Sequence, residues 1–169
     1  SASDTSASFY TTGGAVIEKR LFVGENITTS ANVIGNYFEG TATTAQYADL
    51  AEIYSADADY EPGTVVKLGG SAEVTQTTSF NDPEVFGVVS TNPAYLMNSE
   101  AEGVAVALTG RVPCKVVGNI TKGDMIVTSD VPGVGIAMDN PKLGSVIGKA
   151  LQDYNSTDIG TIEVVVGRL

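Results

Sequence analysis

Five carboxylates lie within one short stretch of the chain and are its first candidates for chemistry. Asp49 and Glu52 are followed by Asp57, Asp59 and Glu61, just ahead of a Pro-Gly pair. Two facing carboxylates can serve as general acid and base in a glycosidase, and alternating carboxylates can hold calcium. The same residue types also initiate turns. The stretch therefore has three interpretations: a catalytic pair, a metal site, or polar groups around a turn.

The calcium interpretation rests on Asp57, Asp59 and Glu61 as weak candidate ligands. Their alternate spacing resembles the start of an EF-hand loop, which also needs glycine at its sixth position and a bidentate glutamate at its twelfth. Those positions hold Pro62 and Leu68, which excludes an EF-hand and leaves only an irregular site. We favour a turn that the aspartates initiate and the Pro-Gly pair completes, and we expect no metal.

The catalytic interpretation rests on Asp49 and Glu52. Sugar-cleaving clefts are usually lined by aromatic residues, above all tryptophan, and this chain has no Trp and only 7% aromatic residues. On an alternating strand the two carboxylates would also face opposite sides. The chain contains no His, which excludes a Ser-His-Asp or Cys-His site within it. We therefore expect no enzyme activity on small molecules and no cofactor.

Two further residue types carry possible reactivity. Cys114 is the only cysteine and lies in an apolar, strand-like run, so we expect a buried structural thiol. Ser3 and Asp4 are weak candidates for autocleavage, because a hydroxyl can attack a strained neighbouring peptide bond when a carboxylate assists. We favour a linker there, and we expect the chain to begin partway through a longer protein, since its first residues are small and polar.

The composition indicates a folded, strongly acidic protein. Its 169 residues are 43% hydrophobic, and none of its apolar runs approaches the roughly 20 residues that span a bilayer. Twenty acidic and nine basic residues give a net charge of −11, and Lys67 is the single base between Glu25 and Gly110. An anionic surface repels phosphate. We therefore expect no nucleic-acid partner and no membrane insertion.

The chain divides into three zones by composition. Residues 1–12 form a linker, residues 13–44 a run of short strands, and residues 45–169 a compact β domain. In the second zone apolar side chains recur at period two, at Leu21, Val23, Ile27 and Val33, between turn residues. Such a narrow row cannot form a core alone. It must stack on the following domain or wind with identical copies of itself.

Residues 45–169 predict an all-β fold, a β-sandwich or an irregular β-barrel with at most one short helix. The runs are rich in β-branched residues and bounded by Gly, Asp, Asn and Pro. Residues 45–54 fit either a short helix or a strand. Pro113 cannot donate to a ladder, so its strand is an edge strand or is bulged there. The predicted strands are 63–68, 72–77, 85–90, 103–109, 112–117, 124–128, 145–151 and 160–166.

Several of these segments together resemble a family. They are Ala-Asp-Leu-Ala-Glu-Ile-Tyr at 48–54, the Gly-Val-Val-Ser-Thr-Asn-Pro run within 85–98, residues 106–118 with 121–129, and residues 144–151. Across 13–169 the chain resembles the C-terminal domains of phage tail-fibre and appendage proteins, notably those of cyanophages. It is more distantly similar to the self-cleaving intramolecular chaperone domain that ends some phage neck appendages.

The resemblance implies a homotrimer at the distal tip of a fibre on the virion, outside the cell. It implies roles in trimer assembly and in attachment to a host-cell surface receptor. Leu21, Val23, Ile27 and Val33 would then face the three-fold axis as a thin trimeric β stalk. The chaperone likeness implies an alternative, a peptidase that cuts beside Ser3 and Asp4. A further alternative is a bacterial surface adhesin module, because its strands have similar composition.

Overall fold

A computed structural model of the chain describes residues 12–30, 33–35, 39–40, 42 and 44–167. The chain forms two units, residues 1–41 and 42–169, and each is considered by itself. The described residues of 12–44 contain no strand, in contrast to the short strands expected there. A strand requires a ladder of hydrogen bonds to a neighbouring strand, and the described residues of this segment are not assigned to one in a single chain. Pairing between three chains stays a prediction.

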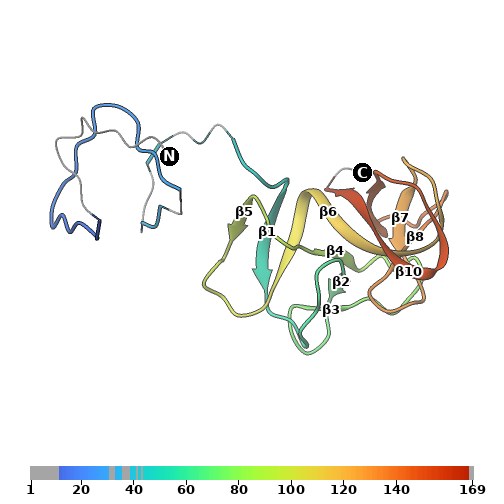
Figure 1. Ribbon diagram of the computed structural model, residues 1–169. Coiled ribbons are helices and arrows are strands. Elements are labelled where there is room, and N and C mark those ends of the chain that lie inside the picture. Colours follow the sequence, from blue (N-terminus) through green and yellow to red (C-terminus); the bar gives the residue numbers. More distant parts are fainter. Residues whose placement is uncertain (1–11, 31–32, 36–38, 41, 43, 168–169) are drawn as a thin grey trace. The chain divides into compact units, whose positions relative to one another are not determined.

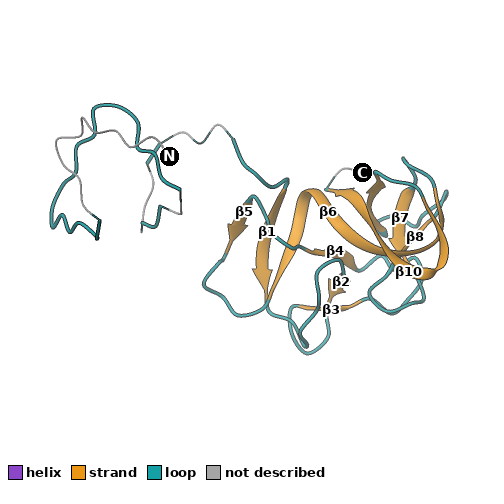
Figure 2. Ribbon diagram, in the orientation of Figure 1, coloured by secondary structure: helices purple, strands orange, loops and turns teal. Residues whose placement is uncertain are grey.

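The second unit is built from strands and loops, which confirms the predicted all-β class (Figure 2). The described residues contain no helix. The ambiguous segment 45–54 contributes a strand. The strands are β1 (Asp49–Tyr54), β2 (Val65–Leu68), β3 (Val74–Gln76), β4 (Val85–Val89), β5 (Tyr95–Met97), β6 (Val104–Ile120), β7 (Met125–Thr128), β8 (Gly135–Ala137), β9 (Val146–Ala150) and β10 (Tyr154–Val166).

Five of the strands close into a barrel. Their order is β10-β9-β7-β8-β6, and the antiparallel pairing of β10 with β6 completes the ring (Figure 1). The remaining strands extend the sheet from β6, through β4 and β2 to β3 on one path and through β1 to β5 on another. Closure removes exposed strand edges from the barrel itself. The two paths end at β3 and β5, and the outer side of β3 carries an isolated bridge between Val74 and Ala56.

The long strand β6 connects the barrel to the added strands. It has 17 residues and curves strongly, as Figure 1 shows, and it replaces the two separate strands predicted at 103–109 and 112–117. Gly110, at the expected break, has a φ of 109° and pairs with both Asp49 of β1 and Val166 of β10. A residue that tolerates positive φ therefore bends this strand without interrupting its ladder.

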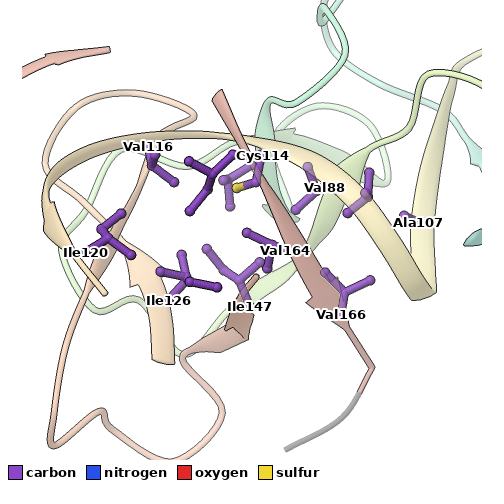
Figure 3. Close-up of a cluster of buried hydrophobic side chains, with 13 residues drawn as sticks. Val88, Ala107, Cys114, Val116, Ile120, Ile126, Ile147, Val164 and Val166 are labelled. Atoms are coloured by element: carbon purple, nitrogen blue, oxygen red, sulfur yellow. The ribbon is translucent and has the colours of Figure 1, made fainter. Parts of the chain in front are cut away.

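Two apolar clusters hold the unit together, and β6 contributes to both. The barrel cluster includes Cys114, Val116, Ile120, Ile126 and Val164, all less than 2% exposed (Figure 3). The second cluster packs between β2, β3, β4 and the start of β6, and its buried members are Val66, Val74, Val89, Val104 and Val106. Along β6, Val104 and Val106 enter the second cluster, whereas Ala107 and the alternate residues from Val112 to Val116 enter the barrel cluster.

Two strands were not expected from the sequence. β8 begins at Gly135, between the strands predicted at 124–128 and 145–151, and only one residue pair, Val116 with Gly135, joins it to β6. β5 pairs in parallel with β1, and its tyrosine and leucine are exposed. Three-residue strands offer too few alternating positions for a pattern to be recognised.

Candidate functional site

The described part of the first unit carries a row of exposed apolar side chains, which we call the apolar row. Each is at least 43% exposed in the single chain. Exposed apolar residues are ordinary when scattered singly, but a contiguous set usually marks an interaction site. The members are Val16, Ile17, Leu21, Phe22, Val23, Ile27, Val33 and Ile34.

All four side chains predicted for the trimer interface belong to the apolar row. Leu21 is 64% exposed, Ile27 67% and Val33 78%, while Val23 is the least exposed at 43%. Four members were missing from the prediction: Val16, Ile17, Phe22 and Ile34. Val16, Phe22 and Ile34 fall on the other parity of the period-two pattern, whereas Ile17 shares its parity and was overlooked. A search for large apolar residues in this segment, without a requirement for period two, would have identified all four.

The three weak calcium candidates have separate surroundings. Asp57 accepts a hydrogen bond from the Tyr60 hydroxyl at 2.5 Å, and bonds from the hydroxyls of Tyr60 and Thr75 lower the pKa of the Asp57 carboxyl. Glu61 is paired with Lys115 Nζ at 3.3 Å. Among the described residues, His, Cys, Asp and Glu side chains form no group of three that could hold a metal ion. The Asp57 carboxylate thus pairs with a tyrosine hydroxyl and the Glu61 carboxylate with a lysine ammonium, at different places.

The turn at the Pro-Gly pair positions β2. Thr64 donates its backbone N–H to the Glu61 carbonyl oxygen at 3.2 Å, which closes the turn. Gly63 has a φ of 84°, a conformation that favours glycine. Its backbone N–H donates to the Val89 carbonyl oxygen at 2.8 Å, and its own carbonyl oxygen accepts from the Lys115 N–H at 2.9 Å. The turn therefore connects β2 to β4 and β6.

Asp49 and Glu52, the disfavoured acid–base candidates, have different environments on β1. The Glu52 carboxylate accepts a hydrogen bond from the Tyr54 hydroxyl at 2.8 Å. Asp49 is only 5% exposed, and its Oδ2 atom is buried without a hydrogen-bond partner. Asp49 lines a surface cavity of about 230 Å³ that Glu52 does not line. The finding of interest is one isolated buried carboxylate rather than a pair.

Backbone hydrogen bonds fix the walls of this cavity. The N–H of Arg111 donates to the Ala48 carbonyl oxygen at 3.2 Å, and the N–H of Ala94 donates to the Asp49 carbonyl oxygen at 2.7 Å. The first bond attaches the start of β1 to β6. The second brings the loop after β4 against the same strand. Residues far apart in the sequence are thus brought to one place.

Pro113 marks the position in β6 where the cavity opens. The N–H groups of Arg111 and Lys115 both donate away from β10, to Ala48 and Gly63. By strand alternation the missing N–H of Pro113 would face the same side, between those two acceptors. An edge strand or a bulge had been expected at Pro113. β6 is instead an inner strand of the sheet, and Pro113 pairs with Glu163 in a regular part of the register with β10. It lies where β6 has no strand partner on that side, and it lines the cavity.

The polar side chains of the cavity come from four segments. Gln46 precedes β1, Thr91 and Asn92 follow β4, Arg111 belongs to β6, and Glu163 to β10. Arg111 Nε lies 4.0 Å from Glu163 Oε2. None of these five residues was a candidate from the sequence. The proline in a strand was the available signal, because it predicted an interruption in pairing at this point.

Cys114 and the pair Ser3 and Asp4 are the remaining candidates for reactivity, and the structure describes only Cys114. Cys114 is fully buried in the barrel cluster, which confirms the expected structural thiol, and burial raises the pKa of its thiol to about 12. Ser3 and Asp4 lie outside the described residues. No helix in the described part of the chain is long and apolar enough to cross a membrane.

Comparison with known proteins gives no further assignment. No protein-family model matches the chain, and no curated protein matches it.

Proposed function

We propose that the chain is the distal domain of a homotrimeric phage tail fibre or appendage, a structural protein of the virion. In this role it acts in trimer assembly and in attachment to the host cell. The observation that carries the proposal is the apolar row, eight large side chains exposed between residues 16 and 34. Neighbouring copies would bury these side chains around a common axis.

The energetics favour association of the apolar row. Full burial of a side chain such as Ile27 contributes about 1.5–3 kcal/mol, and Ile27 is 67% exposed in the single chain. In a trimer each such contribution occurs three times and the copies act together. A segment too thin to form an apolar core by itself would form one between three copies.

The phage assignment is supported by the sequence resemblance together with the all-β architecture. The resembling motifs include β1, β7 and β9 and most of β4 and β6, and three of these strands, β6, β7 and β9, belong to the barrel. A stalk followed by a β-rich terminal domain is the organisation that the resemblance implies.

The proposal is tested by the mass of the full chain in solution. Sedimentation equilibrium should give three times the 17.4 kDa of one chain. A monomer at micromolar concentration would contradict the trimer and with it the proposed role. Intact-mass spectrometry of the same sample tests the alternative peptidase, for which a loss of residues beside Ser3 and Asp4 is expected.

A further inference from the structure

The cavity beside Asp49 contains a buried charge-bearing group whose hydrogen bonding is incomplete. The Asp49 side chain is 5% exposed and its Oδ2 atom has no donor. An unsatisfied buried polar group destabilises a folded protein, and more so when it is charged. Natural proteins keep few such groups, and each requires an explanation. The explanation that we pursue is a ligand that supplies the missing donor.

The carboxylate must turn to meet a ligand, because its Oδ2 atom is closed off from solvent. The terminal torsion of an aspartate side chain is broad, so its two oxygens can turn with small energetic cost. Asp49 already lines the cavity, and the bond from Ala94 N–H to its carbonyl oxygen holds its backbone in place. The backbone of Asp49 is therefore fixed, and its carboxylate can turn toward a donor that enters the cavity.

The chemistry of the walls restricts the ligand. Asp49 and Glu163 only accept hydrogen bonds when ionised, Arg111 only donates, and the Gln46 and Asn92 amides do both. Two carboxylates against one guanidinium disfavour an anion, and the guanidinium disfavours a metal ion. Hydroxyl groups satisfy such a mixed set, because each one donates and accepts. The set therefore fits an uncharged polyhydroxylated molecule.

Aromatic surface continues beyond this cavity. A second hollow of about 470 Å³ shares Gln46 and Tyr47 with it and adds Tyr95 from β5. Tyr47 is 48% exposed and Tyr95 65% exposed. A sugar ring has an apolar C–H face and a rim of hydroxyls, which matches tyrosine faces beside amides and carboxylates. The second hollow provides room for a second ring.

We propose that this pair of hollows is a saccharide-binding site in which Asp49 accepts hydrogen bonds from ring hydroxyls. The site would take an uncharged mono- or disaccharide, with Tyr47 between the two rings. This inference rests on the attachment role proposed above, since it assigns a chemical class to the receptor. It involves binding only, and no bond in the sugar is broken.

The test is saturation-transfer NMR on the full chain with glucose, galactose, mannose and N-acetylglucosamine as probes, followed by titration of any sugar that shows transfer. Asp49→Asn keeps the shape of the side chain and removes its charge. We expect this change to raise the dissociation constant about tenfold to a hundredfold, the factor for a lost hydrogen bond to a charged group.

Matched variants keep the test decisive. Glu52→Gln changes a carboxylate of the same strand that does not line the cavity, and it should leave binding unchanged. Asn92→Ala, at an exposed position after β4, should weaken binding even if the Asp49 variant fails to fold. Tyr95→Ala should affect lactose, a disaccharide probe, more than it affects galactose.

Three results would overturn the inference. The first is the absence of transfer from every sugar in the panel. The second is transfer that survives both Asp49→Asn and Asn92→Ala. The third is Asp49-dependent binding of calcium alone, measured by titration with CaCl₂. A trimer that binds no sugar would sink this inference and leave the proposed fibre role intact. A monomer that binds sugar through Asp49 would support this inference and contradict the proposed trimeric fibre role.

Discussion

The backbone N–H of Arg111 donates to the carbonyl oxygen of Ala48 at 3.2 Å, and this bond joins the middle of the longest strand to the entrance of β1. Beside it, Gly110 pairs with Asp49. The close approach of these two backbones brings Asp49 against β6 and shapes one side of the cavity. The same junction determines both stability and the candidate ligand site.

Gly110→Ala should destabilise the protein strongly. A Cβ at this position would lie 2.2 Å from the Ala48 carbonyl oxygen, and the φ of 109° is itself unfavourable for alanine. The conformational cost alone is about 1–3 kcal/mol, and the clash adds to it. Gly123→Ala is the matched control, because Gly123 also has positive φ but nothing lies within 4 Å of the added Cβ. Urea unfolding of both variants measures the difference, and equal losses would refute the close approach.

Ile27→Asp should convert the proposed trimer into monomers. Three carboxylates would meet where three apolar side chains are proposed to pack, and burying unpaired charges is far more costly than the lost apolar contact. The control is Thr28→Asp, which adds the same charge at the neighbouring exposed position. Sedimentation equilibrium should show monomers for the first variant and trimers for the second. An unchanged mass for Ile27→Asp would count against the predicted interface.

Cys114 should be unreactive in the folded protein. The thiolate is the reactive form, and burial raises the pKa of this thiol to about 12, so almost none is present at pH 8. The side chain is also closed off within the barrel cluster. Ellman's reagent should label the cysteine only after addition of denaturant, at the rate of global unfolding. Rapid labelling of the native protein would show that the barrel opens locally.

Asp82 should make stability depend on acid pH. Its burial acts to raise its pKa, but the Glu84 backbone N–H and the Lys67 ammonium outweigh this and lower the pKa below its ordinary value. Because the folded-state pKa is the lower one, the stabilisation is present above about pH 4 and is lost as pH falls through that folded value.

The variant Asp82→Asn tests this dependence. It should cost about 1–3 kcal/mol at pH 7, the range for a charged hydrogen bond in a buried setting, and less at pH 3. Asp130→Asn, at an exposed position, serves as control and should change little at either pH. Urea unfolding at the two pH values measures the four differences. A loss for Asp82→Asn that is independent of pH would contradict the assigned role of the charge.

The sequence allowed the all-β class and most strand positions of the second unit to be predicted, because β-branched runs bounded by turn residues are a local signal. It did not predict β5 and β8, which depend on contacts made across the fold rather than on their own three residues. The continuity of β6 through Gly110 was missed for a similar reason. A glycine with positive φ usually ends a strand, and here pairing on both sides carries the strand through it.

The candidate cavity was largely beyond prediction. Asp49 was recognised as a carboxylate of interest, but its isolation follows from the Ala94 and Arg111 contacts, which involve residues more than 40 positions away. Glu163 and Asn92 carry no local pattern that distinguishes them from other surface residues. Only Pro113 gave a sequence signal, because a proline within a strand predicts an interruption in strand pairing. It did not indicate that a cavity lies at that interruption.

Because β6 is a wall of both apolar clusters, neither cluster can come apart while the other stays intact. Because β6 packs against both clusters, a pulling force applied at one end of β6 acts on the contacts of both clusters at once. A domain of this construction resists pulling as one body and yields in a single event rather than in stages. Force spectroscopy on a tethered chain should therefore record one rupture peak for residues 44–167.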